Sequence, residues 1–213
     1  MTEIVRLRSG EADVARGALE RCIAGGGVAV FPADGLYGLA CDPLDAAAIA
    51  KIHRLKGRDD GKPSAVMYFS PLAIRELLAG LGPRTKAVAS ALLPGPVTLV
   101  VANPQRRYPL ACRQDPERLG VRLIGGPLAG TMCPVFQTSA NLSGEPAPGR
   151  FEDVPEAIVD GADLAIDGGE LPGLPSTVID VAAIDEDGSW RILRDGAMSP
   201  GDVTSALNSV GLD

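Results

Sequence analysis

Hydrophobic and polar positions follow two different periods along the chain, and these periods predict helices and strands in turn. Residues 12–24 place apolar side chains at helical spacing and end at three consecutive glycines, which is typical of a helix and its stop. Residues 28–31 form a short apolar run, which is typical of a buried strand. Further helices are predicted at 46–55, 71–79, 84–93 and 200–210, and further strands at 65–69, 97–101, 119–124, 136–139, 164–166, 177–181 and 190–193.

This alternation predicts an α/β fold, a twisted mixed β-sheet with flanking helices. A length of 213 residues suits one domain, so we expect residues 1–213 to form a single domain. Residues 33–38 are rich in turn formers and should form a loop after the strand at 28–31. Apolar residues make up 46% of the chain and aromatic residues only 4%, so the core should consist mainly of Val, Ile, Leu and Ala.

Charge and histidine content exclude several classes of function. The chain has 20 basic and 27 acidic residues, and its net charge of −7 has the wrong sign for binding nucleic acid through bulk charge. A single histidine, His53, gives no basis for a Ser-His-Asp triad or a multi-histidine zinc site. We therefore predict no metal site built by the protein itself.

The cysteines and the apolar runs bear on the compartment. Cys22, Cys41, Cys112 and Cys133 form no CxxC pair, so we expect reduced and mostly buried thiols. The longest apolar stretches are far too short to cross a bilayer. These two features predict a cytoplasmic protein with no membrane partner.

Cationic and hydroxyl side chains gather in loops after predicted helices and strands. Lys56-Gly-Arg58 follows the helix at 46–55, where its two cations either face a phosphate or complement the helix dipole. Residues 138–144 place hydroxyls and an amide behind an apolar run, where they either bind phosphate oxygens or form a capped turn. Neither the GxxxxGK[ST] phosphate loop nor the dinucleotide-binding glycine fingerprint is present. Taken singly, each segment leaves both interpretations open.

Eight short blocks occur in one order along the chain. They are PxDxxYGL at 32–39, KGR at 56–58, PGPVTLV at 94–100, GVR at 120–122, SANLSG at 139–144, DGG at 167–169, PSTVID at 175–180 and ILRDGA at 192–197. Together they resemble the YrdC-like family of threonylcarbamoyl-adenylate synthases and relatives, over about residues 25–198. The combination of the KxR and SxN blocks is specific to that family, whereas any one block is not.

The resemblance implies a YrdC-like fold with a positively charged cleft, and a nucleotidyltransferase that joins threonine, bicarbonate and ATP. The implied products are pyrophosphate and threonylcarbamoyl-adenylate, which feeds a tRNA modification. Mg²⁺ would enter with ATP, and cations would stabilise the departing pyrophosphate without a histidine base. Structured RNA such as tRNA is a further possible partner.

The motifs also carry individual site residues over to this chain. Lys56 and Arg58 match cations that face the triphosphate, and they are the predicted catalytic residues. Because exposed cationic pairs rarely hold a fold together, we expect Lys56→Ala or Arg58→Ala to weaken nucleotide binding with little loss of stability. The implied nucleotide-binding residues are Lys56, Arg58, Lys62, Ser139, Asn141 and Arg194. The implied substrate-binding residues are Arg122, for the amino-acid carboxylate, with Ser176, Gly35 and Tyr37, although Tyr37 could equally belong to the core.

The chain departs from the family pattern at the amino-acid end. Ala33 and Gly35 stand where the family loop usually carries two threonines, the second of which normally supplies a hydroxyl to bound threonine. Met67 stands where a histidine or similar polar residue is frequent, and Gln137 replaces a smaller residue. The segment at 123–138 is also short, so we expect the helix there to be trimmed or lost.

Three functions remain open on these residues. The first is a threonylcarbamoyl-adenylate synthase with a variant amino-acid pocket. The second is a paralogue that adenylates or carbamoylates a different small acceptor, because loss of a hydrogen bond to a substrate hydroxyl relaxes selectivity. The third is a non-catalytic nucleotide- or RNA-binding module, for which the available cations are Arg54, Lys56, Arg58, Lys62, Arg84, Lys86, Arg106, Arg107 and Arg113.

Overall fold

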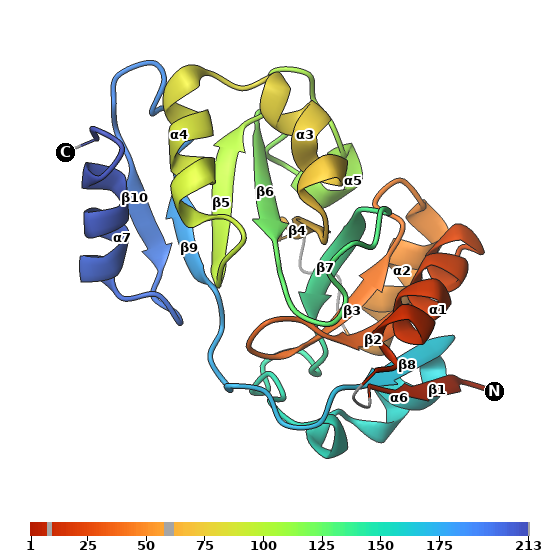
Figure 1. The fold of residues 1–213 in the computed structure, drawn as a ribbon. Helices are drawn as coiled ribbons and strands as arrows, with labels where there is room; N and C mark the ends of the chain where they lie inside the picture. The colour runs from red at the N-terminus through yellow and green to blue at the C-terminus, as the bar shows by residue number, and fades with distance from the viewer. Residues whose placement is uncertain (8–9, 58–61, 213) are drawn as a thin grey trace.

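The computed structural model describes residues 1–7, 10–57 and 62–212, and Figure 1 shows their arrangement. The described strands are β1 (Glu3–Arg6), β2 (Ala29–Pro32), β3 (Tyr37–Cys41), β4 (Ala65–Tyr68), β5 (Val97–Ala102), β6 (Arg118–Leu123), β7 (Val135–Ser139), β8 (Leu164–Asp167), β9 (Thr177–Asp180) and β10 (Arg191–Arg194). The described helices are α1 (Ala12–Ala24), α2 (Ala46–Leu55), α3 (Pro71–Ala79), α4 (Pro83–Leu92), α5 (Pro109–Cys112), α6 (Glu156–Gly161) and α7 (Pro200–Asn208), with a short 3₁₀ helix at Phe151–Asp153.

All ten of these strands belong to one mixed sheet in the order β1-β8-β2-β3-β7-β4-β6-β5-β9-β10. The pairs β1–β8, β2–β8, β4–β6 and β5–β9 are parallel, and the other pairs are antiparallel. This sheet and its flanking helices confirm the predicted α/β class. In Figure 1 the segment between β8 and β9 runs along the lower edge of the molecule and joins its two halves.

Local sequence signals explain where the main helices begin. The Asp45 side chain accepts hydrogen bonds from Ala47 N and Ala48 N at the start of α2. Ser70 caps α3 and Ser199 caps α7, and a proline follows each serine at the first helical position. Each cap contributes about 1 kcal/mol, and together they explain why the helices predicted at 46–55, 71–79 and 200–210 begin as expected.

The alternation of side chains along β6 creates the two faces on which the molecule is built. Leu119, Val121 and Leu123 are buried in the larger hydrophobic core, which also contains residues of α3, α4 and α7. Arg118, Gly120 and Arg122 alternate with them and line a pocket. One face of the strand therefore stabilises the fold, while the other carries charge.

The structure corrects the prediction around β3. Residues 33–38 were expected to form one loop, but the loop spans only 33–36, and Tyr37 already begins β3, which pairs with both β2 and β7. All five residues of β3 are buried, so the strand lacks the polar alternation by which sequence reasoning finds strands. The short strand β1 and helices α5 and α6 were also missed. The absence of a helix at 124–134, in contrast, confirms the expected trimming.

Candidate active site

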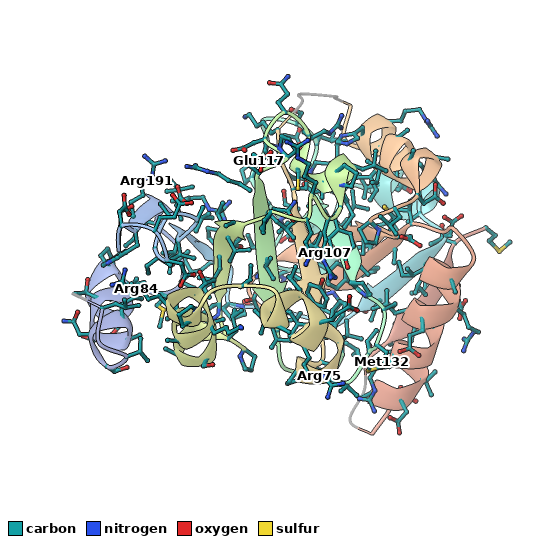
Figure 2. All side chains as sticks on the ribbon, turned by 90° about the horizontal axis from the view of Figure 1, so that it is seen from above. Arg75, Arg84, Arg107, Glu117, Met132 and Arg191 are labelled. Carbon is teal, nitrogen blue, oxygen red and sulfur yellow. The ribbon has the colours of Figure 1, made fainter. Side chains whose placement is uncertain are left out.

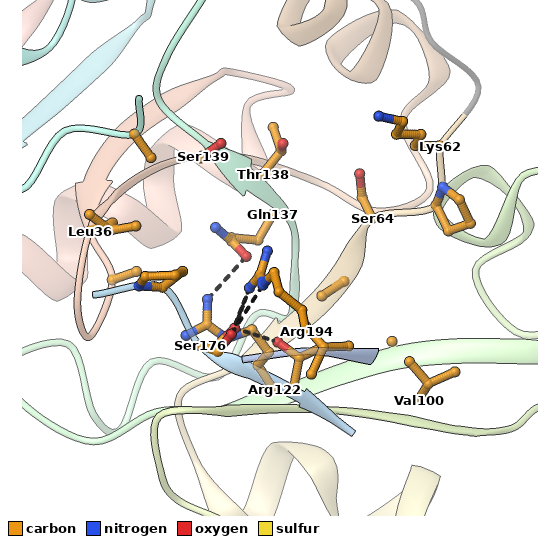
Figure 3. A pocket seen from close by; sticks show the side chains of 18 of the residues that line it. Leu36, Lys62, Ser64, Val100, Arg122, Gln137, Thr138, Ser139, Ser176 and Arg194 are labelled. Atoms are coloured by element: carbon orange, nitrogen blue, oxygen red, sulfur yellow. Dashed lines mark hydrogen bonds between the residues drawn. The ribbon is translucent and has the colours of Figure 1, made fainter. Parts of the chain in front are cut away.

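A pocket of about 510 Å³ lies on the charged face of the sheet. Its walls come from β5, β6, β7 and β10, the loop between β2 and β3, and residues 62–64, which precede β4. Figure 3 shows Arg122, Gln137, Arg194 and Ser176 grouped together, with Lys62 and Ser64 set apart from them. Segments that are far apart in the sequence thus deliver cations, hydroxyls and amides to one cavity.

One group in this wall, which we name the arginine cluster, consists of Arg122, Asp34 and Gln137. Arg122 Nη2 donates to Asp34 Oδ1 at 2.5 Å, and Arg122 Nη1 donates to Gln137 Oε1 at 3.3 Å. The Arg122 side chain is 7% exposed and that of Asp34 is 25% exposed. Asp34 Oδ2 and Arg122 Nε are buried and form no hydrogen bond within the described part of the chain. Each partner of the ion pair therefore has one buried polar atom that lacks a hydrogen bond among the described residues.

A second guanidinium, that of Arg194, lies beside this cluster. It donates to Ser176 O at 2.7 Å and to Ser176 Oγ at 3.1 Å, and Ser176 Oγ is 2.8 Å from Thr98 Oγ1. Burial, together with the nearby positive charge of Arg122, lowers the pKa of Arg194 from its ordinary value. Two like charges held this close favour an anionic ligand between them.

Lys56, Ser139 and Asn141 form another group, which we name the lysine network. Lys56 is 2% exposed, and its Nζ donates to Ser139 O, to Asn141 O at 3.0 Å and to Asn141 Oδ1 at 3.2 Å. Ser139 Oγ donates in turn to Asn141 Oδ1. The sequence analysis predicted an exposed lysine, and this prediction is wrong: Lys56 is buried and fixes the turn that follows β7.

The other predicted nucleotide residues have different surroundings. Lys62 is exposed and lines the pocket, as does Ser139, whereas Asn141 reaches it only through the lysine network. Arg58, the second predicted catalytic cation, lies outside the described residues. The structure thus brings Lys56, Lys62 and Ser139 to one cavity with Arg122, Arg194 and Ser176.

Gly35 is covered by the chain segment at 168–176, which we name the strap. Gly173 N donates to Gly35 O at 2.9 Å, and a Cβ placed on Gly35 would lie 1.9 Å from Leu174 O. Position 35 therefore has no room for any side chain, and it is Leu174 of the strap that lines the pocket here. The hydroxyl that the family motif carries at this position is excluded by main-chain packing.

Tyr37 lines the pocket and also holds the strap. Its hydroxyl accepts a hydrogen bond from Gly168 N at 2.9 Å and donates one to Gly169 O at 2.8 Å. Burial raises the pKa of Tyr37 to about 12, although the hydrogen bond from Gly168 acts in the opposite direction. Both of the alternatives considered for Tyr37 therefore apply, since its side chain belongs to the core and to the pocket wall.

Sequence reasoning gave no role to Asp34 and His53, which the structure places in the pocket wall. Asp34 lies in the PxDxxYGL motif at 32–39, in which the resemblance assigns roles only to Gly35 and Tyr37. Arg113 Nη2 lies 2.6 Å from His53 Nε2, within hydrogen-bond distance. Met67, in contrast, is fully buried in the core near α1, so this departure from the family pattern lies outside the pocket.

The carboxylates of the pocket are paired with arginines. Asp34 contacts Arg122, and Asp115 lies 3.8 Å from Arg118. Within the described part of the chain, no group of three or more His, Cys, Asp or Glu side chains could hold a metal ion. A divalent cation in this pocket would therefore need most of its oxygen ligands from a bound phosphate.

Several arginines outside the pocket are bonded to nearby groups. Arg106 contacts Glu117, Arg107 contacts Glu76, and Arg84 donates to Ile184 O. Figure 2 labels Arg84, Arg107 and Arg191 on separate parts of the surface. Their charges are thus dispersed and largely neutralised by neighbours. Among the described helices, none is long and apolar enough to span a membrane.

The family model Sua5_yciO_yrdC, described as "Telomere recombination", matches residues 21–196. The threonylcarbamoyl-AMP synthase of Chromohalobacter salexigens is 33% identical over 163 residues, which cover 73% of this chain and 86% of that protein. The protein of the same name from Rattus norvegicus is 33% identical over 207 residues, covering 89% and 69% of the two chains.

Solved structures agree with this match. P. abyssi Sua5 complexed with L-threonine superposes with a TM-score of 0.79 at 26% identity, covering 97% of this chain but 60% of the Sua5 chain. E. coli YciO superposes with a TM-score of 0.76 at 22% identity, covering 92% and 96%, and supports the fold. The chain therefore belongs to the Sua5/YciO/YrdC family.

Proposed function

We propose that this protein is a threonylcarbamoyl-AMP synthase, which forms threonylcarbamoyl-AMP and pyrophosphate from threonine, bicarbonate and ATP. The observation that carries the proposal is the convergence of Arg122, Arg194, Lys62 and the lysine network on one pocket. Such a pocket can hold a carboxylate and a triphosphate together. The names of the family members, and the L-threonine bound to P. abyssi Sua5, support the same activity.

In this proposal the reaction relies on positioning and charge neutralisation. The threonine ammonium gives one proton to bicarbonate, which loses water to form carbon dioxide, and the free amine attacks that carbon dioxide and releases its second proton to solvent. The resulting carbamate oxygen then attacks the α-phosphorus of ATP. A new P–O bond forms as the bond to the pyrophosphate oxygen breaks. Neither step needs a histidine base, because the described cations stabilise the charge that develops on pyrophosphate. Mg²⁺ enters with ATP, held mainly by phosphate oxygens.

Each cluster has a defined task in the proposed reaction. Arg122 binds the carboxylate of threonine through its planar guanidinium, and Ser176, which accepts a hydrogen bond from Arg194, lines the same pocket. Arg194 and Lys62 face the phosphates, and Lys56 holds Ser139 and Asn141 in place for the nucleotide. Arg58 lies outside the described residues, and its proposed role on the phosphates rests on the KGR motif alone. Lys56 therefore acts as a positioning residue rather than as a mobile cation.

A second candidate function is the same adenylation with a different small acceptor. The observation that favours it is the contact between Gly35 and Leu174 O, which leaves no room for a side-chain hydroxyl at position 35. The pocket wall there carries Ala33, Leu36 and Leu174. An acceptor that needs no hydroxyl partner at this point would fit such a wall.

One experiment separates the two candidates. Purified protein is incubated with ATP, bicarbonate and each of the twenty amino acids, and pyrophosphate release is measured alongside the mass of the adenylate product. Threonine-dependent release with a threonylcarbamoyl-AMP mass supports the synthase. Release with another amino acid and not with threonine supports the second candidate. No amino-acid-dependent release would refute both.

The proposed activity also places the protein in the cell. We propose that residues 1–213 act as one domain, because one sheet connects all the described strands. We propose a cytoplasmic location, which is compatible with ATP and bicarbonate as substrates and with a tRNA as the final destination of the product. Direct binding of structured RNA is not needed for synthesis, and the paired surface arginines give it little support.

A further inference from the structure

We propose that Asp34 selects for acceptors that carry an ammonium group, by exchanging its contact with Arg122 for a contact with that group. This inference rests on the proposed function, because it takes Arg122 to be the site of the acceptor carboxylate. It adds a specificity-determining residue to the reaction, and it concerns a side chain of the pocket wall.

The first argument is the incomplete bonding of the ion pair. Asp34 meets Arg122 through one oxygen only, Oδ1, which also accepts a hydrogen bond from Gly35 N at 3.0 Å. Asp34 Oδ2 and Arg122 Nε are both buried and lack hydrogen-bond partners. A buried polar atom without a partner costs free energy, and a ligand that supplies the partner recovers it. The pair thus presents one unused acceptor and one unused donor.

The second argument is the match between these two groups and an α-amino acid. The carboxylate and the ammonium of an α-amino acid are attached to the same carbon, so a ligand that binds Arg122 through its carboxylate must place its ammonium close by. Asp34 is the carboxylate in contact with Arg122 and carries the charge opposite to that ammonium. A zwitterion can therefore replace the Asp34–Arg122 contact with two new charged contacts.

The third argument concerns ligands without an ammonium group. Such a carboxylate would compete with Asp34 for Arg122 and then face the displaced negative charge at short range, with nothing to neutralise it. Arg194 cannot readily compensate, because its guanidinium is already bonded to Ser176. Asp34 therefore acts against simple carboxylic acids and in favour of amino acids, which is selectivity by repulsion as well as by attraction.

The test compares matched ligands that differ only in the charged group. Dissociation constants are measured by calorimetry on the full chain for L-threonine and for 2,3-dihydroxybutanoate, in which a hydroxyl replaces the ammonium. L-alanine and L-lactate form a second pair that is independent of the threonine side chain. For the pair that contains the substrate of the enzyme, we expect the wild-type protein to bind the amino acid at least about tenfold more tightly than the hydroxy acid. A ratio near one would overturn the proposal without any variant.

The informative variant is Asp34→Asn, which keeps the shape and removes the charge. We expect this variant to bind the amino acid more weakly than the wild type does and the hydroxy acid more tightly. Acetate, a carboxylate without an ammonium group, should also bind more tightly. The preference for the amino acid over the hydroxy acid should therefore fall about tenfold. Asp115→Asn is the matched control, because it removes one charge from the same wall next to Arg118. The control should leave the ratio within about twofold, since Asp115 does not contact Arg122.

Two outcomes would contradict the proposal. If Asp34→Asn weakens both ligands of a pair equally, Asp34 only orients Arg122. If it leaves both dissociation constants unchanged, Asp34 takes no part in binding either ligand. Failure of the proposed function would look different: the wild-type protein would release no pyrophosphate with threonine, while acetate would still bind more tightly to Asp34→Asn than to the wild type. If the variant does not fold, the ligand ratios of the wild-type protein decide.

Discussion

The lysine network and the arginine cluster line the same pocket but hold their charges in different ways. The ammonium of Lys56 is bonded to main-chain oxygens of residues 139 and 141, together with one side-chain oxygen. The guanidinium of Arg122 is bonded only to side chains, those of Asp34 and Gln137. Main-chain partners remain whatever residue occupies the position, whereas side-chain partners can be exchanged for a ligand or altered by substitution. The lysine network therefore suits a rigid part of the pocket wall, and the arginine cluster suits a site whose contacts change when the acceptor binds.

The sharpest test of this difference is Arg122→Ala. The substitution leaves the Asp34 carboxylate partly buried without its cation, and we expect the free energy of unfolding to fall by about 3–5 kcal/mol. The Arg122→Ala variant should also lose turnover with the acceptor. Urea denaturation and a pyrophosphate assay measure the two effects. Arg118→Ala on the same strand is the control, since its side chain is 40% exposed and its buried partner Asp180 keeps a second arginine, Arg191, so the loss should be smaller. Equal losses in the two variants would contradict the role assigned to the cluster.

The lysine network predicts the next largest effect. In Lys56→Met the volume is kept while three oxygen atoms each lose one donor, although Asn141 Oδ1 keeps the hydrogen bond from Ser139 Oγ. We therefore expect the free energy of unfolding to fall by about 2–3 kcal/mol and nucleotide binding to weaken. This reverses the expectation of little stability loss drawn from sequence. Lys51→Met on the same helix removes a surface pair with Asp163 and should cost less than about 1 kcal/mol. A stable Lys56→Met protein with normal ATP affinity, measured by calorimetry, would show that the network is dispensable.

The strap provides a third comparison, at position 35. Gly35→Ala places a Cβ against Leu174 O, a main-chain atom, so the strap must shift and we expect a loss of about 2 kcal/mol. Gly125→Ala is the control, because a Cβ there meets nothing within 4 Å. The melting temperatures of the two variants measure the difference. If both are equally stable, the strap yields easily, and a threonine at position 35 could then restore the family hydroxyl.

Much of the fold follows from local sequence signals. The helices at 12–24, 46–55 and 71–79 have the predicted bounds: apolar spacing marks all three, Asp45 caps the second, and Ser70 and Pro71 begin the third. The strand β3 escaped prediction because burial on both faces removes its alternation. The alternation of polar and apolar residues marks a strand that has one exposed face, whereas a strand buried on both faces has no polar positions by which to recognise it.

The site residues could be predicted where they lie within a family motif. Lys56, Ser139, Arg122 and Arg194 do meet at one pocket, as the motifs imply. Three features could not be read from the sequence: the burial of Lys56, the pairing of Asp34 with Arg122, and the strap across Gly35. Each of these depends on contacts between segments far apart in the chain, which no local pattern contains.

The smallest expected effect belongs to Tyr37, which ties the strap to β3. Tyr37→Phe removes the hydroxyl that bonds Gly168 N and Gly169 O, so we expect a loss of about 1 kcal/mol near neutral pH. Burial raises the folded-state pKa of Tyr37 from 10 to about 12. The stabilisation is therefore fully present below pH 10 and is lost as the pH rises toward 12. Chemical denaturation of both proteins from pH 7 to 11 measures the difference, in which titration of the cysteines cancels. The gap between wild type and Tyr37→Phe should narrow above pH 10, and a gap that stays constant would show that the phenol does not titrate in contact with the strap.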